Sequence, residues 1–158
     1  MIDETDKKIV SILQGNARLS NAEIAEKVGL TASSVHERVK KLEKKGILRR
    51  YVAIVDAERL GKPMLAFIRL SVSSQSIRET IQKVCATEPD ILECHDVAGE
   101  DCYVLKVRAE GPKQLERLLT AIKSRSDAIR SITNIVLSSY KETNYVEPAR
   151  EAEEGGME

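Results

Sequence analysis

The densest positive charge in the chain lies in residues 31–50, which hold seven Lys and Arg residues against two Glu residues. Lysine, arginine and serine side chains are common donors to the phosphate oxygens of nucleic acids, and glutamate can accept a hydrogen bond from the cytosine amino group in the major groove. The residue types in this segment therefore suit contact with double-stranded DNA.

Helices that could position this charge are indicated by their capping residues. Asp3 is a plausible N-cap for a first helix that ends at about Gly15, and Ser20 and Glu23 form the S-x-x-E capping box of a second. Gly29 ends that second helix, because glycine readily takes the left-handed conformation of a helix C-terminus.

A third helix is predicted to begin directly after this turn, with Thr31 as its cap and Gly46 at its end. Val35, Val39 and Leu42 form an apolar stripe that would dock it on the other helices. Three helices with a tight, glycine-containing turn between the second and third are typical of a helix-turn-helix DNA-binding domain.

The side of the third helix opposite the apolar stripe is the predicted DNA-contacting surface, given a rotation of about 100° per residue. The predicted contact residues, with the flanks and the basic extension of this helix, are Ser33, Ser34, His36, Glu37, Arg38, Lys40, Lys41, Lys44, Arg49 and Arg50. A lysine-rich helix face is, by itself, more often only solvated. Here the two capped helices and the turn between them favour DNA contact.

The overall net charge of zero conceals an uneven distribution. Residues 1–55 contain 11 Lys and Arg against 7 Asp and Glu, whereas residues 142–158 contain 1 against 6. A basic N-terminal part and an acidic tail are therefore predicted, and the neutral total does not argue against nucleic acid. The tail has no hydrophobic periodicity and is expected to be disordered.

The protein is expected to be soluble and cytoplasmic, without a membrane partner. Its apolar runs are only a few residues long, and the charged N-terminus lacks the apolar core of a signal peptide. The three cysteines form no C-x-x-C pair and leave one thiol over in any pairing, so reduced structural cysteines are expected.

The second half of the chain is predicted to form a ferredoxin-like domain, which makes the fold α+β. The pattern indicates strands at 64–73, 91–98, 102–109 and 131–139 and helices at 76–87 and 112–124. Their order, βαββαβ, is that of one sheet with two helices on one face. The first strand is apolar on both sides, so another subunit is expected to cover the second face.

Four segments follow from these patterns. They are a helix-turn-helix domain at 1–50, an extended strand and linker at 51–63, a ferredoxin-like oligomerisation domain at 64–141, and the acidic tail at 142–158. The alternating pattern of "ILRRYVAIV" at 47–55 predicts that the linker begins as a strand.

The chain resembles the Lrp/AsnC (leucine-responsive or feast/famine) transcription regulators. The resemblance covers about residues 1–141 and is carried by "DETDKKIVSILQGNARLSNAEIAEKVGLTASSVHERVKKLEKKGIL", "RRYVAIVDAERLG" and "DVAGEDCYVLKV". It implies a DNA-binding first half, a second half that forms dimers and then tetramers or octamers, and a small effector, usually an amino acid, bound between dimers. It also implies that the 47–55 strand pairs with its copy in a partner.

The resemblance places an effector site near Gly99, which lies in the turn between two predicted strands. Backbone N–H groups there suit a carboxylate, and acidic side chains suit an ammonium group. The implied effector-binding residues are Gly99, Glu100, Asp101, Cys102, Tyr103 and Thr133. Many members have aspartate where this chain has Cys102, and the shift of Asp101 by one position reverses its side-chain direction. The alternative is that the two acids only solvate a turn.

Catalysis and metal binding are not indicated, and no cofactor is expected. Cys94 and His95 would point to opposite faces of a strand, which disfavours a shared ion. The prediction is therefore a sequence-specific DNA-binding regulator. The alternatives are a non-specific architectural DNA-binding protein and a stand-alone small-molecule sensor.

Overall fold

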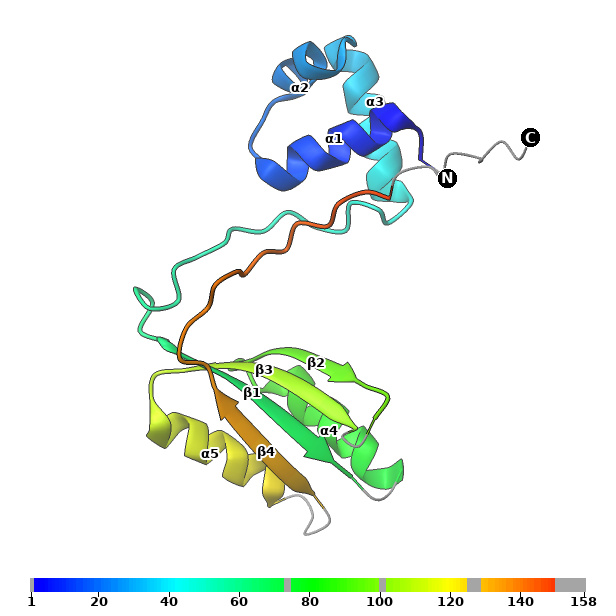
Figure 1. Cartoon of the computed structure of the whole chain (residues 1–158). Coiled ribbons are helices and arrows are strands. Elements are labelled where there is room, and N and C mark those ends of the chain that lie inside the picture. The colour runs from blue at the N-terminus through cyan, green and yellow to red at the C-terminus, as the bar shows by residue number, and fades with distance from the viewer. Residues whose placement is uncertain (1, 73–74, 100–101, 125–128, 150–158) are drawn as a thin grey trace, which may run out of the picture. The chain divides into compact units, whose positions relative to one another are not determined.

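The computed structural model describes residues 2–72, 75–99, 102–124 and 129–149 of the chain. The chain divides into two compact units, one made of residues up to Ala53 together with those from Lys141, the other of Ile54–Tyr140. Figure 1 shows that the first unit is helical and that the second is a sheet with helices packed on it. No helix among the described residues has both the length and the apolar composition needed to cross a membrane.

The first unit contains the three predicted helices, α1 (Glu4–Gly15), α2 (Asn21–Val28) and α3 (Ala32–Lys44). Asp3, Ser20 and Thr31 cap them, each accepting a hydrogen bond from the backbone N–H three residues further on. Glu23 completes the capping box, since its Oε2 accepts from the backbone N–H of Ser20 at 2.7 Å. The helix-turn-helix prediction is confirmed.

A small apolar core holds these helices together. Its buried members come from all three, and they are Ile9, Leu13, Ile24, Ala25, Val35 and Leu42. Val35 and Leu42 are 0% and 1% exposed, which confirms the predicted docking stripe of α3, and Val39 packs against the same core. Gly29 takes the left-handed conformation (φ 72°, ψ 36°) that allows α3 to begin immediately after α2.

The second unit contains the predicted βαββαβ sequence of elements. They are β1 (Met64–Ser71), α4 (Gln75–Thr87), β2 (Ile91–Asp96), β3 (Tyr103–Ala109), α5 (Pro112–Lys123) and β4 (Arg130–Ile135). The strands form one sheet in the order β2-β3-β1-β4, with β1 antiparallel to both of its neighbours. The ferredoxin-like, α+β prediction is confirmed.

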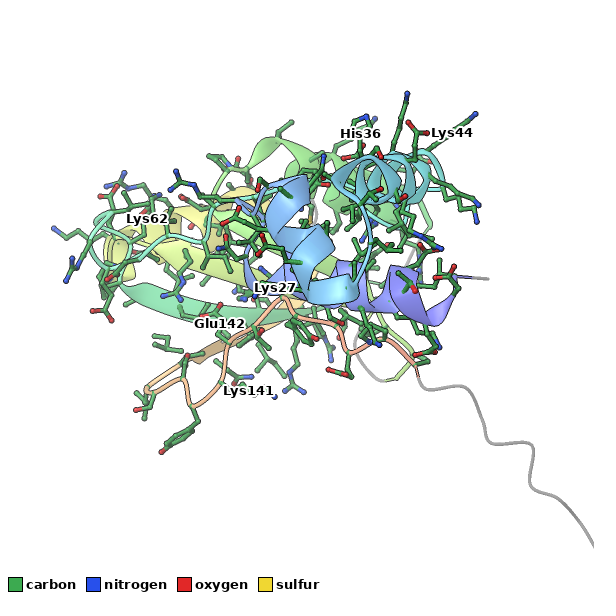
Figure 2. All side chains as sticks on the ribbon, turned by 90° about the horizontal axis from the view of Figure 1, so that it is seen from above. Lys27, His36, Lys44, Lys62, Lys141 and Glu142 are labelled. Atoms are coloured by element: carbon green, nitrogen blue, oxygen red, sulfur yellow. The ribbon has the colours of Figure 1, made fainter. Side chains whose placement is uncertain are left out.

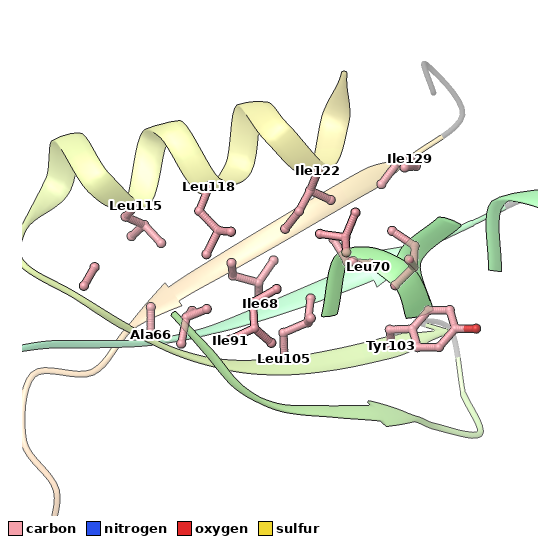
Figure 3. Packing of buried hydrophobic residues seen from close by; sticks show 14 residues of the cluster. Ala66, Ile68, Leu70, Ile91, Tyr103, Leu105, Leu115, Leu118, Ile122 and Ile129 are labelled. Carbon is pink, nitrogen blue, oxygen red and sulfur yellow. The ribbon is translucent and has the colours of Figure 1, made fainter. Parts of the chain in front are cut away.

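One face of this sheet forms the core with α4 and α5. Figure 3 shows Leu115, Leu118 and Ile122 of α5 packed over the strands. Ile68 and Leu105, which are opposite one another on β1 and β3, are both 0% exposed. Burial of such a side chain stabilises the fold by about 1.5–3 kcal/mol, so these contacts hold the strands in register.

The predicted strand at 47–55 does not form in this chain. Residues 49–56 have no regular secondary structure. A strand needs a neighbouring strand for its backbone hydrogen bonds, and none of the described strands pairs with this segment. Its large side chains are consequently exposed, with Val52 at 57%, Ile54 at 81% and Val55 at 60%. The predicted strands at 64–73, 91–98 and 131–139 are shorter than expected, ending at Ser71, Asp96 and Ile135.

Candidate DNA-binding and effector-binding sites

The outward face of α3 carries most of the predicted DNA-contacting residues. Nine of the ten are exposed, namely Ser33, Ser34, His36, Glu37, Lys40, Lys41, Lys44, Arg49 and Arg50. Figure 2 shows His36 and Lys44 projecting from this helix. Because Val35 and Leu42 face the core, the helix presents a continuous polar surface that is basic toward its C-terminal end.

The N-terminal end of α3 holds a cluster of hydroxyl groups. The Thr31 Oγ1 atom lies 3.1 Å from Ser33 Oγ and 2.9 Å from Ser34 Oγ, and it accepts from the Ser34 backbone N–H at 3.2 Å. No acidic residue occupies the first turn of this helix. Hydroxyl donors beside free backbone N–H groups at a helix N-terminus make a favourable position for a phosphate oxygen.

His36 lies on the flank of α3 that faces α2. Its Nδ1 atom is 3.4 Å from the Asn21 side-chain nitrogen, so the two helices of the motif are joined by a polar contact at the surface. Glu37, the next residue, is exposed on the outward side. His36 thus contacts α2, whereas Glu37 faces solvent.

Arg38, predicted to flank the DNA-contacting surface, pairs with two carboxylates near the start of α1. Its Nη1 atom donates to Asp3 Oδ2 at 2.6 Å and to Asp6 Oδ1 at 2.7 Å. Hydrogen bonding to Asp3 and then Asp6 raises the pKa of the Arg38 guanidinium, and the bond from Arg38 lowers the pKa of Asp3. Arg38 therefore connects α3 to the start of α1.

The segment after α3 is attached to that helix by a side-chain hydrogen bond. The Tyr51 Oη donates to Glu43 Oε1 at 2.9 Å, and burial together with this carboxylate raises the pKa of Tyr51 to about 12. Arg49 and Arg50 lie between these two residues and are exposed. Their basic charge is therefore held close to the C-terminal end of α3.

The residues implied for the effector site are only partly brought together. Glu100 and Asp101 lie outside the described residues. Gly99 has φ 146°, a conformation that favours glycine, and Tyr103 begins β3 directly after Cys102. Thr133 lies on β4 opposite Ile68, and β1 separates it from β3. Within one chain Thr133 is thus two strand spacings, roughly 10 Å, from the strand of Tyr103.

Cys102 and Tyr103 are built into the end of the sheet. Cys102 donates its backbone N–H to Leu70 O at 2.8 Å and its thiol to Val72 O at 3.6 Å. Tyr103 is 2% exposed, and its hydroxyl is buried without a hydrogen-bond partner in the described part of the chain. The guanidinium carbon of Arg78 lies 5.9 Å from the centre of its ring. Tyr103 is therefore a core residue of the second unit, and its implied role in effector binding stays a prediction.

A shallow hollow of about 530 Å³ opens at the same end of the sheet, and the sequence did not indicate it. Its lining residues are Arg69, Ser71, Lys123, Ile129, Arg130, Ser131 and Ile132. Ser131 and Tyr103 both lie opposite Leu70, which places the hollow and Tyr103 in the same row of the sheet. Its size suits a small molecule, and its basic side chains suit a carboxylate. In the sequence, the basic residues at the end of β1 and the start of β4 could have pointed to this hollow.

The cysteines form no metal or disulfide site in the described residues. All three thiols are free and pack against the core of the second unit. Cys94 lies opposite Leu105 and His95 opposite Val104, so the two side chains point to opposite faces of β2, as predicted. Among the residues that the structure describes, no group of three His, Cys, Asp or Glu side chains is close enough to hold a metal ion.

Two family models match the two halves of the chain. Residues 2–49 match a winged helix-turn-helix DNA-binding model, and residues 65–146 match the Lrp/AsnC ligand-binding domain. The HTH-type transcriptional regulator FL11 of Pyrococcus horikoshii is 37% identical over 142 residues, which cover 90% of this chain and 93% of that protein.

Known structures of the same family have the same fold. A transcriptional regulator from Neisseria meningitidis in complex with L-Met superimposes with a TM-score of 0.86 at 30% identity, covering 92% of this chain and 96% of the other. A feast or famine regulatory protein from M. tuberculosis complexed with L-methionine gives 0.83 at 27% identity, covering 94% and 100%. The chain belongs to the Lrp/AsnC family of DNA-binding transcription regulators, which are not enzymes.

Proposed function

We propose that this regulator recognises specific DNA sequences by inserting α3 into the major groove. The observation that carries the proposal is the division of α3 into two sides. Val35 and Leu42 are buried, while Glu37, Lys40 and Lys41 are exposed on the other side. Lysines there would bind phosphates and fix the orientation, and Glu37 would contact base edges.

The regulator would act as a dimer or a larger homo-oligomer. The sheet face that α4 and α5 do not cover carries Phe67 and Ile132, which are 37% and 50% exposed. The exposed apolar side chains of the unpaired segment 49–56 would gain strand partners from a second copy. Two recognition helices set about 34 Å apart would then suit a pseudo-palindromic site.

An amino acid would modulate this assembly from the second unit. L-Met is bound in two of the similar structures. In this chain the hollow beside Ser131 offers Lys123 and Arg130 to a carboxylate, and Thr133 follows on the same strand. A ligand that binds one assembly more tightly than another shifts the population toward it, and so changes which DNA sites are occupied together.

A competition assay tests the sequence-specific function. Labelled DNA from the region upstream of the chain's own gene would be displaced by the same unlabelled fragment and by random DNA of equal length. We expect random DNA to require about a thousandfold higher concentration at physiological salt. A ratio near one would instead support a non-specific architectural protein, and no binding to either DNA would leave only small-molecule sensing.

A further inference from the structure

We infer that Arg38 is a positioning residue that sets the rotation of the recognition helix and does not itself contact DNA. The inference rests on the proposed role of α3 in the major groove and adds how that helix is held. It arises from the bridge in which one guanidinium nitrogen donates to Asp3 at 2.6 Å and to Asp6 at 2.7 Å.

The position of Arg38 on α3 agrees with this role. At 100° per residue, Arg38 lies about 60° from Val35 on the core side, whereas Glu37 and Lys44 lie about 160–180° from it. The Arg38 side chain is 33% exposed, and the Asp6 side chain that it meets is 11% exposed. Arg38 is thus directed toward α1 and away from the DNA-contacting surface.

Both carboxylates are themselves fixed in place. Asp3 uses Oδ1 to cap α1, accepting from the Asp6 backbone N–H at 2.7 Å, and uses Oδ2 to bind Arg38. Asp6, which is 8% exposed when the whole residue is counted, is the one buried charged residue in the described part of the chain. A charge in such surroundings requires a partner, and Arg38 supplies it.

The apolar contacts of α3 do not fix its rotation in the same way. Val35 and Leu42 hold the helix through non-directional burial, whereas charge-assisted hydrogen bonds depend on direction. A rotation of about 20° would move side-chain tips by roughly 2 Å at the ~6 Å radius of a helix. That displacement exceeds the tolerance of a hydrogen bond to a base edge, so the bridge from Arg38 preserves sequence recognition.

The variant Asp3→Asn separates positioning from direct contact, because the two roles predict opposite results. Asparagine still caps α1 but no longer offers a charge to Arg38. If Arg38 positions α3, binding to the specific site weakens about three- to tenfold while binding to random DNA is retained. If Arg38 binds phosphate directly, loss of the competing carboxylate strengthens binding to both DNAs.

Glu26→Gln is the matched control for charge. It removes one carboxylate from the exposed surface of α2 in the same unit, and any general electrostatic gain it produces is subtracted from the Asp3→Asn result. Arg38→Lys keeps a cation within reach of the carboxylates and is expected to restore most of the specific binding that Arg38→Met loses. If Arg38→Met does not fold, Asp3→Asn and Arg38→Lys still decide between the two roles.

The full-length chain is used throughout, with thermal melting to confirm folding and the salt dependence of binding as a second readout. If Arg38 only positions α3, the slope of log K against log salt should be the same for the wild type, Arg38→Lys and Arg38→Met, because no phosphate contact is lost. A slope reduced by about 0.9 in Arg38→Met, or tighter binding by Asp3→Asn, overturns the inference. If the wild type does not discriminate between the two DNAs, the proposed function fails instead.

Discussion

Gln14 and Val146 are joined by two hydrogen bonds, although they are 132 positions apart in the chain. The Gln14 side-chain nitrogen donates to Val146 O at 2.9 Å, and the Val146 backbone N–H donates to Gln14 Oε1 at 2.8 Å. The side-chain amide thus pairs with the backbone as a neighbouring strand would. Residues 142–149, part of the segment expected to be disordered, are therefore attached at Val146 to α1.

Replacing this glutamine should release the attached segment. We expect Gln14→Ala to increase hydrogen exchange at the Val146 amide and to lower the free energy of unfolding of the helical unit by about 1 kcal/mol, the usual size of such hydrogen bonds. Exchange measured by mass spectrometry checks the first effect and thermal melting the second. Gln82→Ala, on the exposed surface of α4, is the control and should change neither.

Acid should weaken the helical unit through its capping box. The hydrogen bonds from the Ser20 backbone and then the Ser20 side chain lower the pKa of Glu23 below its ordinary value of 4.5. A lowered pKa in the folded state means that the stabilisation is present above pH 4.5 and is lost as the pH falls through the folded value. We therefore expect Glu23→Gln, which can still form the box, to show a smaller loss of thermal stability between pH 5 and pH 3 than the wild type.

Glu26→Gln is the control for the pH experiment because it removes a carboxylate of α2 that takes no part in the cap. Its melting temperature should follow the wild-type pH dependence. Parallel curves for Glu23→Gln and wild type would show that the capping box does not contribute to the acid sensitivity of this unit.

Glu37 should control which sequence is preferred. The Glu37 side chain is exposed on the outward side of α3, and a carboxylate accepts from a cytosine amino group. We expect Glu37→Ala to lower discrimination at one base position by about tenfold while affinity for random DNA does not fall. Selection from a randomised DNA library measures this, and Glu26→Ala should leave the selected sequence unchanged. An unaltered preference in Glu37→Ala would remove Glu37 from base recognition.

An amino-acid effector should stabilise the second unit. We expect millimolar L-methionine to raise the melting temperature, since a ligand at 100 times its Kd stabilises by about 2.7 kcal/mol, and D-methionine to have a smaller effect. Thr133→Val removes the hydroxyl of the implied effector-binding threonine with little change of shape and should reduce the shift. If none of the twenty amino acids changes the melting temperature, this proposed effector class is wrong.

Local signals in the sequence predicted the helical unit well. The Ser20 and Glu23 box, Gly29 and the stripe of Val35 and Leu42 each depend on residues close together in the chain, and the structure contains all of them. The bridge from Arg38 could not be predicted from local spacing, because its partners, Asp3 and Asp6, are more than thirty residues away. The angular position of Arg38 beside Val35 was a usable signal for an inward role.

The effector-binding region was harder to predict because it depends on how strands are paired. The positions of these residues in the sequence do not reveal that β1 lies between the strands of Tyr103 and Thr133. Nor do they reveal that Ser131 and Tyr103 both lie opposite Leu70, in one row of the sheet. The segment 49–56 has a strand-like pattern but no partner among the described strands. Pattern can indicate a tendency to form a strand, whereas a strand also requires a second segment to receive its hydrogen bonds.

The salt dependence of DNA binding tests the central proposal most directly. Lys40 and Lys41 are exposed on α3, and each phosphate contact contributes about 0.9 to the slope of log K against log salt. In Lys40→Ala/Lys41→Ala we expect weaker binding to every sequence and a slope reduced by about 2. The control pair Lys83→Ala/Lys113→Ala, on exposed surfaces of α4 and α5, should keep the wild-type slope. An unchanged slope and affinity in the α3 variant would contradict the placement of α3 in the groove.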